Sequence, residues 1–535
     1  MNRNVIIPLL LFLASAWTLS SQEASLSVER EEVAVTIGGI ESVASQVELP
    51  AAPDFVEGGS IDVEERLDPM VPLPRIPDPE PEMGITVTDV GDSLSVVGTF
   101  GGGSASTVLG SIEVSRFGNG PDFHFSYEQD RRDGGFDRNP GTGFQSQVHA
   151  LETEILLEDE DRGLVGTASF VTRQRGLQGL SQYHSADLRS IDGTVEGYLA
   201  PSESLRFSGG IFAGDYRRVL AVTSDQGAPV LSRSAVAPFL SLELSFPRVT
   251  VETGASYRGN WFSGVEHPSV HRFGLSLSGD IVLRPGTRLF LSAEAGYQNG
   301  YGALFPASLT LESDISRALF VSASIQHTLR TNYFDGIWTD VSTIDPTALT
   351  DILGTPEEGL GGSISTEWRI VPEQFILIGD LGYMSRSSAL DIAPYDSVSG
   401  LTPVEMDDRD ELTSTIRSRI ASGGWNGEVF WLQRWLDRGV MEARTEAGIS
   451  LSYRTERLRL FLDSTLPYFD AFDLPLVDFR AEYVIAPTAF LSLFVDDTLS
   501  PFAREERTVY GAFTDDSHPF AAEGMRVGAT VSVRL

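Results

Sequence analysis

The last eleven residues of the chain, 525–535, alternate strictly between apolar and polar or small side chains. This period of two predicts a β-strand with one apolar face and one polar face. A strand of this length suits an outer membrane, where crossing takes about 9–11 residues. Its backbone N–H and C=O groups would be unsatisfied in hydrocarbon unless the sheet closed on itself. The C-terminal strand therefore constrains the chain to a closed β-barrel. Its apolar positions are Met525, Val527, Ala529, Val531, Val533 and Leu535.

Strand-like segments with the same alternation recur from about residue 93 to the end of the chain. Short turns and longer polar loops alternate between them, with exceptions at 437–441 and near 101–103. This asymmetry is typical of barrels with short periplasmic turns and long extracellular loops. The predicted fold class is all-β, a large antiparallel transmembrane β-barrel of about 22 strands. We expect the turns near 118–121, 159–162, 201–203, 246–248, 284–286, 313–317, 371–373, 422–424, 454–457 and 486–488. We expect the loops at 131–144, 174–187, 217–233, 259–272, 331–361, 385–411 and 496–523.

The first 92 residues have a different composition from the rest. Residues 1–21 have the basic start, short apolar run and small-residue exit of a signal peptide. Residues 22–92 are rich in proline and acid, which favours an extended periplasmic tail or linker rather than a folded domain. Residues 93–535 are then the barrel, and the expected location is the outer membrane of a diderm bacterium.

The chain carries 75 acidic and 39 basic residues, a formal charge of −36, and no cysteine. So acidic a chain argues against nucleic acid as a partner, because phosphate would be repelled. The absence of cysteine excludes disulfides and thiolate chemistry.

Charged residues fall on the polar face of many predicted strands, where a water-filled lumen tolerates them better than a dry core does. Both signs face inward, so we expect only mild ion selectivity: a cation preference would need the carboxylates to be unpaired. Aromatic residues that suit the membrane interface are Trp425, Trp431, Trp435, Tyr453 and Tyr483. The candidate lumen-lining residues are Glu128, Asp192, Glu196, Asp380, Arg417, Arg419, Arg459, Asp478, Arg480 and Glu482.

Catalytic and metal-binding patterns are absent from the sequence. No G-x-S-x-G, Walker A or H-E-x-x-H motif occurs. His267 and His271 are four residues apart, but Pro268 and the surrounding loop argue against a helix-borne metal pair. The acidic run 407–411 falls in a predicted loop, where solvation explains it. We therefore expect no enzyme, with no catalytic, cofactor-binding or metal-binding residues and no cofactor.

The end of the chain resembles the barrel of a TonB-dependent receptor. Residues 491–497 are similar to that family's penultimate strand and its exit, and 520–535 to its final strand; the resemblance covers 93–535. It implies an N-terminal TonB-contacting box, which Glu32, Val33, Ala34, Val35 and Thr36 resemble. Residues 22–91 are about half of what a family plug needs, so we expect no standard plug domain.

The functional expectation is an outer-membrane transport protein, receptor-like or porin-like, that passes a small solute through the lumen. The alternative is a surface-exposed structural or adhesive barrel that binds ligands through its long loops. The expected partners are outer-membrane lipid, the barrel-assembly machinery, a small-solute substrate and a separate plug or periplasmic energising protein, without nucleic acid.

Overall fold

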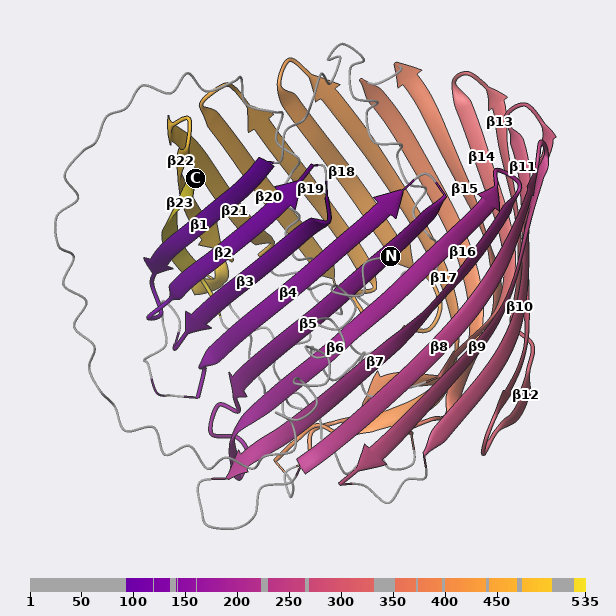
Figure 1. Ribbon diagram of the computed structural model, residues 1–535. Coiled ribbons are helices and arrows are strands. Elements are labelled where there is room, and N and C mark those ends of the chain that lie inside the picture. Colours follow the sequence, from indigo (N-terminus) through magenta and orange to yellow (C-terminus); the bar gives the residue numbers. More distant parts are fainter. Residues whose placement is uncertain are drawn as a thin grey trace. The chain divides into compact units, whose positions relative to one another are not determined.

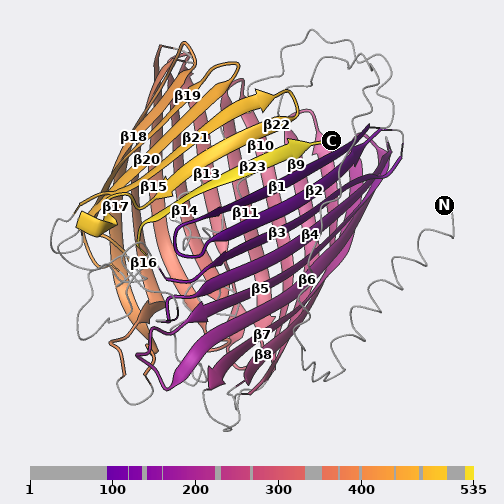
Figure 2. The same ribbon diagram turned by 90° about the vertical axis from the view of Figure 1, so that its left-hand side faces the viewer.

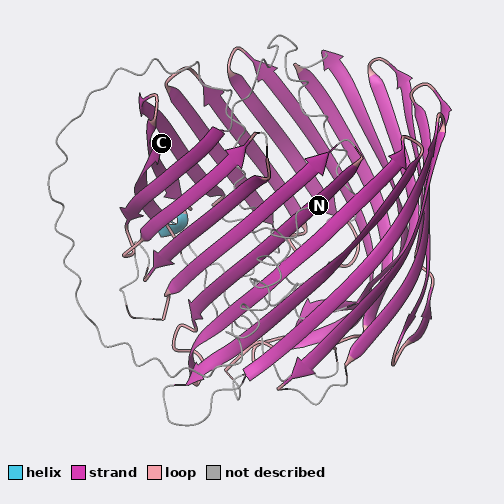
Figure 3. Ribbon diagram, in the orientation of Figure 1, coloured by secondary structure: helices cyan, strands magenta, loops and turns pink. Residues whose placement is uncertain are grey.

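The described part of the protein is built almost entirely from β-strands (Figure 3). Every described residue belongs to the compact unit that runs from Glu64 to Leu535. The residues predicted to form a signal peptide, 1–21, those predicted to form a proline-rich tail, 22–92, and the TonB-box-like residues Glu32–Thr36 within them lie outside the described residues. The computed structural model describes residues 93–118, 120–134, 141, 143–159, 161–222, 230–264, 269–331, 352–371, 374–396, 400–438, 442–468, 474–502 and 524–535.

The strands follow one another along the chain as antiparallel neighbours. The first eleven are β1 (Ser93–Gly103), β2 (Val108–Phe117), β3 (Asp122–Arg132), β4 (Ser146–Asp159), β5 (Arg162–Gly176), β6 (Tyr183–Ser202), β7 (Leu205–Val222), β8 (Val230–Phe246), β9 (Val249–Ser263), β10 (Val270–Arg284) and β11 (Thr287–Gln298). The next six are β12 (Gly302–Leu304), β13 (Ala307–Ser316), β14 (Leu319–Thr331), β15 (Pro356–Val371), β16 (Phe375–Ile392) and β17 (Val404–Ser422). The last six are β18 (Trp425–Arg434), β19 (Thr445–Arg454), β20 (Leu458–Tyr468), β21 (Leu476–Ala486), β22 (Ala489–Asp496) and β23 (Arg526–Arg534), with a short 3-10 helix at Ser500–Phe502.

The sheet closes because β23 pairs with both β22 and β1 (Figures 1 and 2). β12 and β13 both pair with β11, one after the other along its length, so together they occupy one place in the ring. The described residues therefore form a closed antiparallel barrel of 22 strands, which confirms the predicted fold class and strand count.

The two ends of the barrel differ in the length of their connections. At the end where β1 begins and β23 finishes, which we call the turn end, connections have two to four residues. At the opposite end, the loop end, they have three to 29 residues. The segment 437–441 is not an exception, because it belongs to the ten-residue connection between β18 and β19 at the loop end. The expected exception near 101–103 remains: the β1–β2 connection has four residues, as many as the turn-end connection between β2 and β3.

An apolar band covers the outer face of the barrel. Outward side chains such as Leu199, Ile211, Leu240 and Leu275 are 51%, 46%, 69% and 64% exposed, as expected for residues that face lipid. Aromatic residues border the band: the rings of Trp425 and Tyr453 pack in a tilted arrangement with their centres 4.5 Å apart, beside a turn-end hairpin. Outward Trp431, Trp435 and Tyr483 are also exposed.

Several strands extend well beyond the membrane at the loop end, where loops were predicted. β6, β7, β16 and β17 have 20, 18, 18 and 19 residues, whereas crossing takes about 9–11. The predicted loops at 174–187 and 385–411 were therefore too long. Above the apolar band the outward residues are polar, so the apolar alternation stops while the backbone ladder continues.

Three consecutive glycines end β1 at the seam with β23. A side chain at Gly103 would collide with the backbone of Val527 and Gly528, and one at Gly101 with Ala529 and Thr530. The seam therefore needs glycine for close backbone approach.

Gly103→Val should lower the free energy of unfolding of the barrel by about 1–3 kcal/mol, the usual cost of overpacking. The measurement is the fraction of protein that refolds to the heat-modifiable form on a gel. Gly98→Val is the matched control on the same strand, because nothing lies within 4 Å of its added Cβ. Equal refolding of the two variants would contradict this account of the seam.

Candidate functional site: the inner wall and its mouth

All ten candidate lumen-lining residues lie on strands, and the register places each on the inner face. On β21, for example, Phe479 and Tyr483 face outward, so Asp478, Arg480 and Glu482 between them face inward. On β6, outward Leu199 puts Asp192 and Glu196 on the inner side. Their role in lining a path for solute stays a prediction.

Several of these residues are paired. The Arg419 Nε atom lies 2.6 Å from Glu428 Oε2, and Arg459 Nη1 lies 3.9 Å from Glu482 Oε2. In these contacts opposite charges cancel locally, so fewer unpaired charges face the lumen. Ser169 donates to Asp192 at 2.8 Å, Ser365 to Asp380 at 2.6 Å, and the Asp497 N–H to Asp478 at 2.7 Å.

A group of inward arginines that the sequence did not reveal lies on β5 to β9 near the loop end. Arg173 and Arg218 share the register position of inward Leu188, and Arg233 lies opposite inward Tyr216. Arg233 is fully buried with its guanidinium 4.6 Å from the Tyr216 ring centre, and all five make contacts within the protein. We call Arg173, Arg175, Arg218, Arg233 and Arg258 the arginine belt.

The same strands carry carboxylates nearer the turn end. Asp192 and Glu196 follow the belt along β6, and Glu252 lies six residues before Arg258 on β9. Glu128 and Glu152 are inward on β3 and β4. This wall of the lumen is therefore basic toward the loop end and acidic toward the turn end. We call Glu128, Glu152, Asp192, Glu196 and Glu252 the acidic zone.

The acidic run 407–411 lies on β17 and not in a loop, which corrects the prediction. β16 has a bulge at Ser388, where φ is 55°. Because of this extra residue, the β16 residues that pair with β17 just before and just after the bulge both face the inside of the barrel. Arg409 Nε lies 2.7 Å from Glu411 Oε1, and Arg386 Nη1 lies 2.8 Å from Glu357 Oε1. Arg386 also contacts Glu411, at 3.3 Å. Because their exposure is 15% or less, these side chains form a buried ion-pair network at the base of the β16–β17 hairpin.

Two loops meet across the mouth of the barrel. The loop 177–182 follows β5, and the loop 393–403 follows β16. With β12 and β13 counted as one place, ten described strands, β6 to β16, lie between the loops one way round the ring, and twelve, β17 to β5, lie between them the other way. Leu177 and Leu401 are 0% and 1% exposed in one apolar cluster with Ala186 and Leu220. The Tyr395 hydroxyl donates to the Leu180 carbonyl oxygen at 2.6 Å. We call this apolar cluster and hydrogen bond the cross-mouth contact. It joins loops that come from nearly opposite sides of the ring.

The protonation state of Tyr395 suits this contact. Burial raises the pKa of its hydroxyl, and the neighbouring Asp396 carboxylate raises it further. The hydroxyl therefore stays protonated well above neutral pH and remains a donor.

The remaining sequence expectations concern metals and helices. His271 faces outward on β10 and bonds Tyr257 and Ser269, while His267 lies outside the described residues. Within the described ranges no group of three or more His, Cys, Asp or Glu side chains could hold a metal ion. No helix of the described residues is long and apolar enough to cross a membrane.

A closed 22-stranded barrel with a charged inner wall and a loop-covered mouth is the architecture of the large outer-membrane transporters. The comparison with solved structures agrees. The chain is similar to the copper transporter OprC, with 10% identity, coverage of 84% of this chain and 81% of that one, and a TM-score of 0.65.

It is also similar to the siderophore receptor PirA of Acinetobacter baumannii, with 6% identity, coverage of 84% and 81%, and a TM-score of 0.64. For the iron transporter FrpB of Neisseria meningitidis the values are 11%, 83%, 82% and 0.62. No protein-family model and no curated protein matches the sequence. The barrel therefore has the fold of the TonB-dependent receptors, as the sequence resemblance indicated.

Proposed function

We propose that the protein takes up a small anionic solute across the outer membrane and binds it first at the arginine belt. In this proposal the loop end faces the outside of the cell, because extracellular loops are the longer ones in such barrels. The observation that carries the proposal is the sign of charge on β5 to β9: the loop-end half of that wall is basic although the whole chain is strongly acidic. Arginine is also the side chain best suited to planar anions.

The acidic zone makes free diffusion of the same anion through the lumen unfavourable. An anion that left the belt toward the turn end would meet carboxylates, which repel it. This order of charges supports a gated receptor more than an open pore. The same order of charges supports uptake that is driven by an energising partner in the periplasm. In this proposal residues 32–36 would contact that partner. The similar structures are described as transporters or receptors of copper, iron and siderophores, so an anionic metal chelate is a suitable solute class.

Binding of ferric citrate to the full-length protein in detergent, measured by calorimetry, tests the proposal. Replacing Arg175 and Arg258 with glutamine should weaken binding about tenfold or more, because a hydrogen bond to a charged group contributes roughly 1.5–3 kcal/mol. Arg162→Gln is the matched control, since that arginine lies at the turn end and is 67% exposed. Equal affinity in the wild type and the double variant would exclude the belt as the binding site.

A conductance measurement separates a receptor from an open channel and from an adhesive barrel. The ring closes by direct pairing of β1 with β23, so a chain that begins at Ser93 can be compared with residues 22–535. Silence of the longer chain and openings of the shorter one support gating. Steady large openings of both would exclude the energised-receptor proposal, and silence of both would favour surface binding through the loops.

A further inference from the structure

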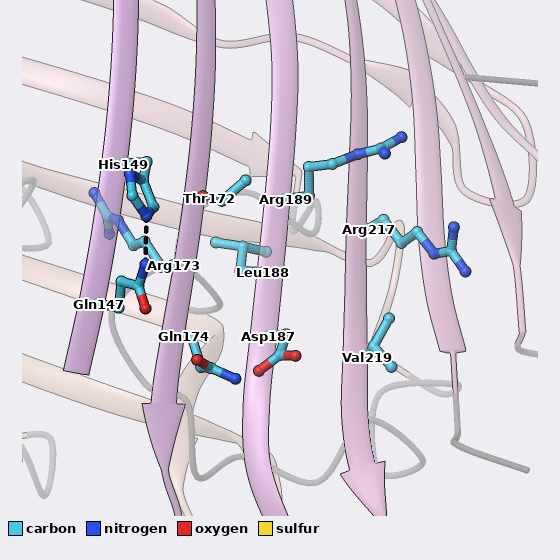
Figure 4. Close-up of a pocket in the computed structure, with 10 residues that line it drawn as sticks. All are labelled: Gln147, His149, Thr172, Arg173, Gln174, Asp187, Leu188, Arg189, Arg217 and Val219. Atoms are coloured by element: carbon cyan, nitrogen blue, oxygen red, sulfur yellow. Dashed lines mark hydrogen bonds between the residues drawn. The ribbon is translucent and has the colours of Figure 1, made fainter. Parts of the chain in front are cut away.

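A cavity of about 390 Å³ lies on β4 to β7 near the loop end (Figure 4). Its lining includes His149, Thr172, Arg189 and Arg217. These four residues are paired with one another in order across β4, β5, β6 and β7. Arg189 is an even number of residues from outward Leu199 on β6, and Arg217 is an even number from outward Ile211 on β7, so the four side chains lie on the outer face. The cavity therefore opens on the outside of the barrel, although Arg173 of the arginine belt and inward Leu188 also contribute to its lining.

Arg189 and Arg217 lie directly opposite each other on β6 and β7. Figure 4 shows both side chains extended in the same direction. Two like charges in directly opposed positions destabilise a sheet. Neither arginine makes a hydrogen bond or an ion pair with another described residue, and the Arg189 Nε atom is buried without a partner. The pair is therefore a site of uncompensated positive charge on a protein with a formal charge of −36.

The carboxylates nearest in register form no ion pair with these arginines, although Asp187 also lines the cavity. Asp187 and Asp215 each lie two residues from one of the arginines on the same face. Ser185 donates to Asp187 at 2.9 Å, and Ser234 donates to Asp215 at 2.9 Å. Neither carboxylate forms an ion pair with Arg189 or Arg217, so the guanidinium groups keep donors available for a ligand.

The height of the pair on the barrel identifies its surroundings. Toward the turn end, the outward residues of β6 are Ile191, Gly193, Val195, Gly197 and Leu199, which belong to the apolar band. Arg189 is two residues beyond Ile191, or roughly 7 Å further along the strand. The pair therefore lies at the loop-end border of the apolar band, which is the headgroup level of the outer leaflet in the orientation of the proposed function, on which this inference rests.

We propose that this cavity binds the phosphate group of an outer-leaflet glycolipid, with the acyl chains lying on the apolar band below it. Phosphate matches the chemistry: guanidinium groups bind it with two parallel hydrogen bonds, and one dianion between Arg189 and Arg217 removes their repulsion. Gln174, beside the pair, carries an amide that can donate to the sugar or phosphate oxygens. A lipid is favoured over a soluble anion because the cavity opens at headgroup height on the outer wall.

The test uses the full-length protein in nanodiscs of phosphatidylcholine, with and without diphosphoryl lipid A. Lipid A should raise the midpoint of the heat-induced gel shift of the wild type and should stay bound through purification in mild detergent, as measured by mass spectrometry. Arg189→Gln with Arg217→Gln should lose both effects. Arg162→Gln is the matched control, because it removes an arginine at the turn end and should retain both.

Two further lipids complete the experiment. Dephosphorylated lipid A should neither stabilise the wild type nor remain bound, which shows that the phosphate is recognised. Retention of diphosphoryl lipid A by the double variant would overturn the proposal. So would equal stabilisation of the wild type by millimolar inorganic phosphate alone, since the site would then belong to a soluble anion.

Discussion

Oxidation of a chain that carries Ser181→Cys and Gly400→Cys is expected to lock the mouth of the barrel shut. An ideal Cβ at Gly400 lies 2.7 Å from Ser181 Cα and 3.1 Å from Ser181 Oγ, so the two positions come within the reach of a disulfide after a small separation of the loops. The native chain has no cysteine, so no other pairing competes. The two loops sit on opposite sides of the ring, and a covalent link between them would hold the cross-mouth contact closed.

The measurement is the rate at which ferric citrate binds to the oxidised and the reduced double variant. Oxidation should abolish binding from solution, and dithiothreitol should restore it. Each single-cysteine variant controls for the strain of replacing Gly400, whose φ of +70° favours glycine. An oxidised double variant that binds as fast as the reduced one would mean that solute enters beside the contact and not through it.

Arg409→Ala should destabilise the barrel by about 3–5 kcal/mol, the usual cost of removing one partner from a buried ion pair. The substitution leaves Glu411 and Asp391, which are 9% and 16% exposed, without a close cation on that side. The midpoint of the heat-induced gel shift should fall accordingly. In contrast, Arg162→Ala removes an ion pair whose side chains are 67% and 65% exposed, and it should change stability by no more than about 1 kcal/mol.

A second substitution distinguishes lost charge pairing from lost packing. Adding Glu411→Gln to Arg409→Ala removes the carboxylate that the first change strands, so part of the stability should return. Arg386 keeps its contact with Glu357 in that variant. If Glu411→Gln adds a further loss instead, the network is not what stabilises the base of the β16–β17 hairpin.

The architecture of the barrel was largely predictable because the membrane imposes simple rules on the sequence. Strict alternation in 525–535 gave the last strand, and proline and glycine at the turns gave the connections at the turn end. The strand count followed from these two signals. Above the apolar band the rules no longer apply: outward Arg189 and Arg217 are polar, and apolar alternation is absent from the neighbouring ranges 174–187 and 217–233, which the sequence therefore predicts as loops.

The candidate site was predictable only where a strand was recognised. The ten inward residues came from alternation inside the membrane, whereas Arg175, Arg218 and Arg233 lie in segments that had been assigned to loops. Continued alternation of Tyr216, Arg218 and Leu220 was a signal that could have identified them. The cross-mouth contact was beyond sequence reasoning, because Leu180 and Tyr395 are 215 positions apart and nothing local predicts that they meet.

The extended hairpins that carry the two loops have a consequence for how the mouth opens. β6, β7, β16 and β17 are held by backbone ladders that reach the loops, interrupted by register shifts near Tyr183 and Ser388, while the contact between the loops is made by apolar side chains and the Tyr395 hydrogen bond. The molecule should therefore show two distinct rates of amide hydrogen exchange: slow exchange throughout the ladders and fast exchange in 177–182 and 400–403. Opening would then be a local event, and the mouth could work many times without any strand leaving the ring.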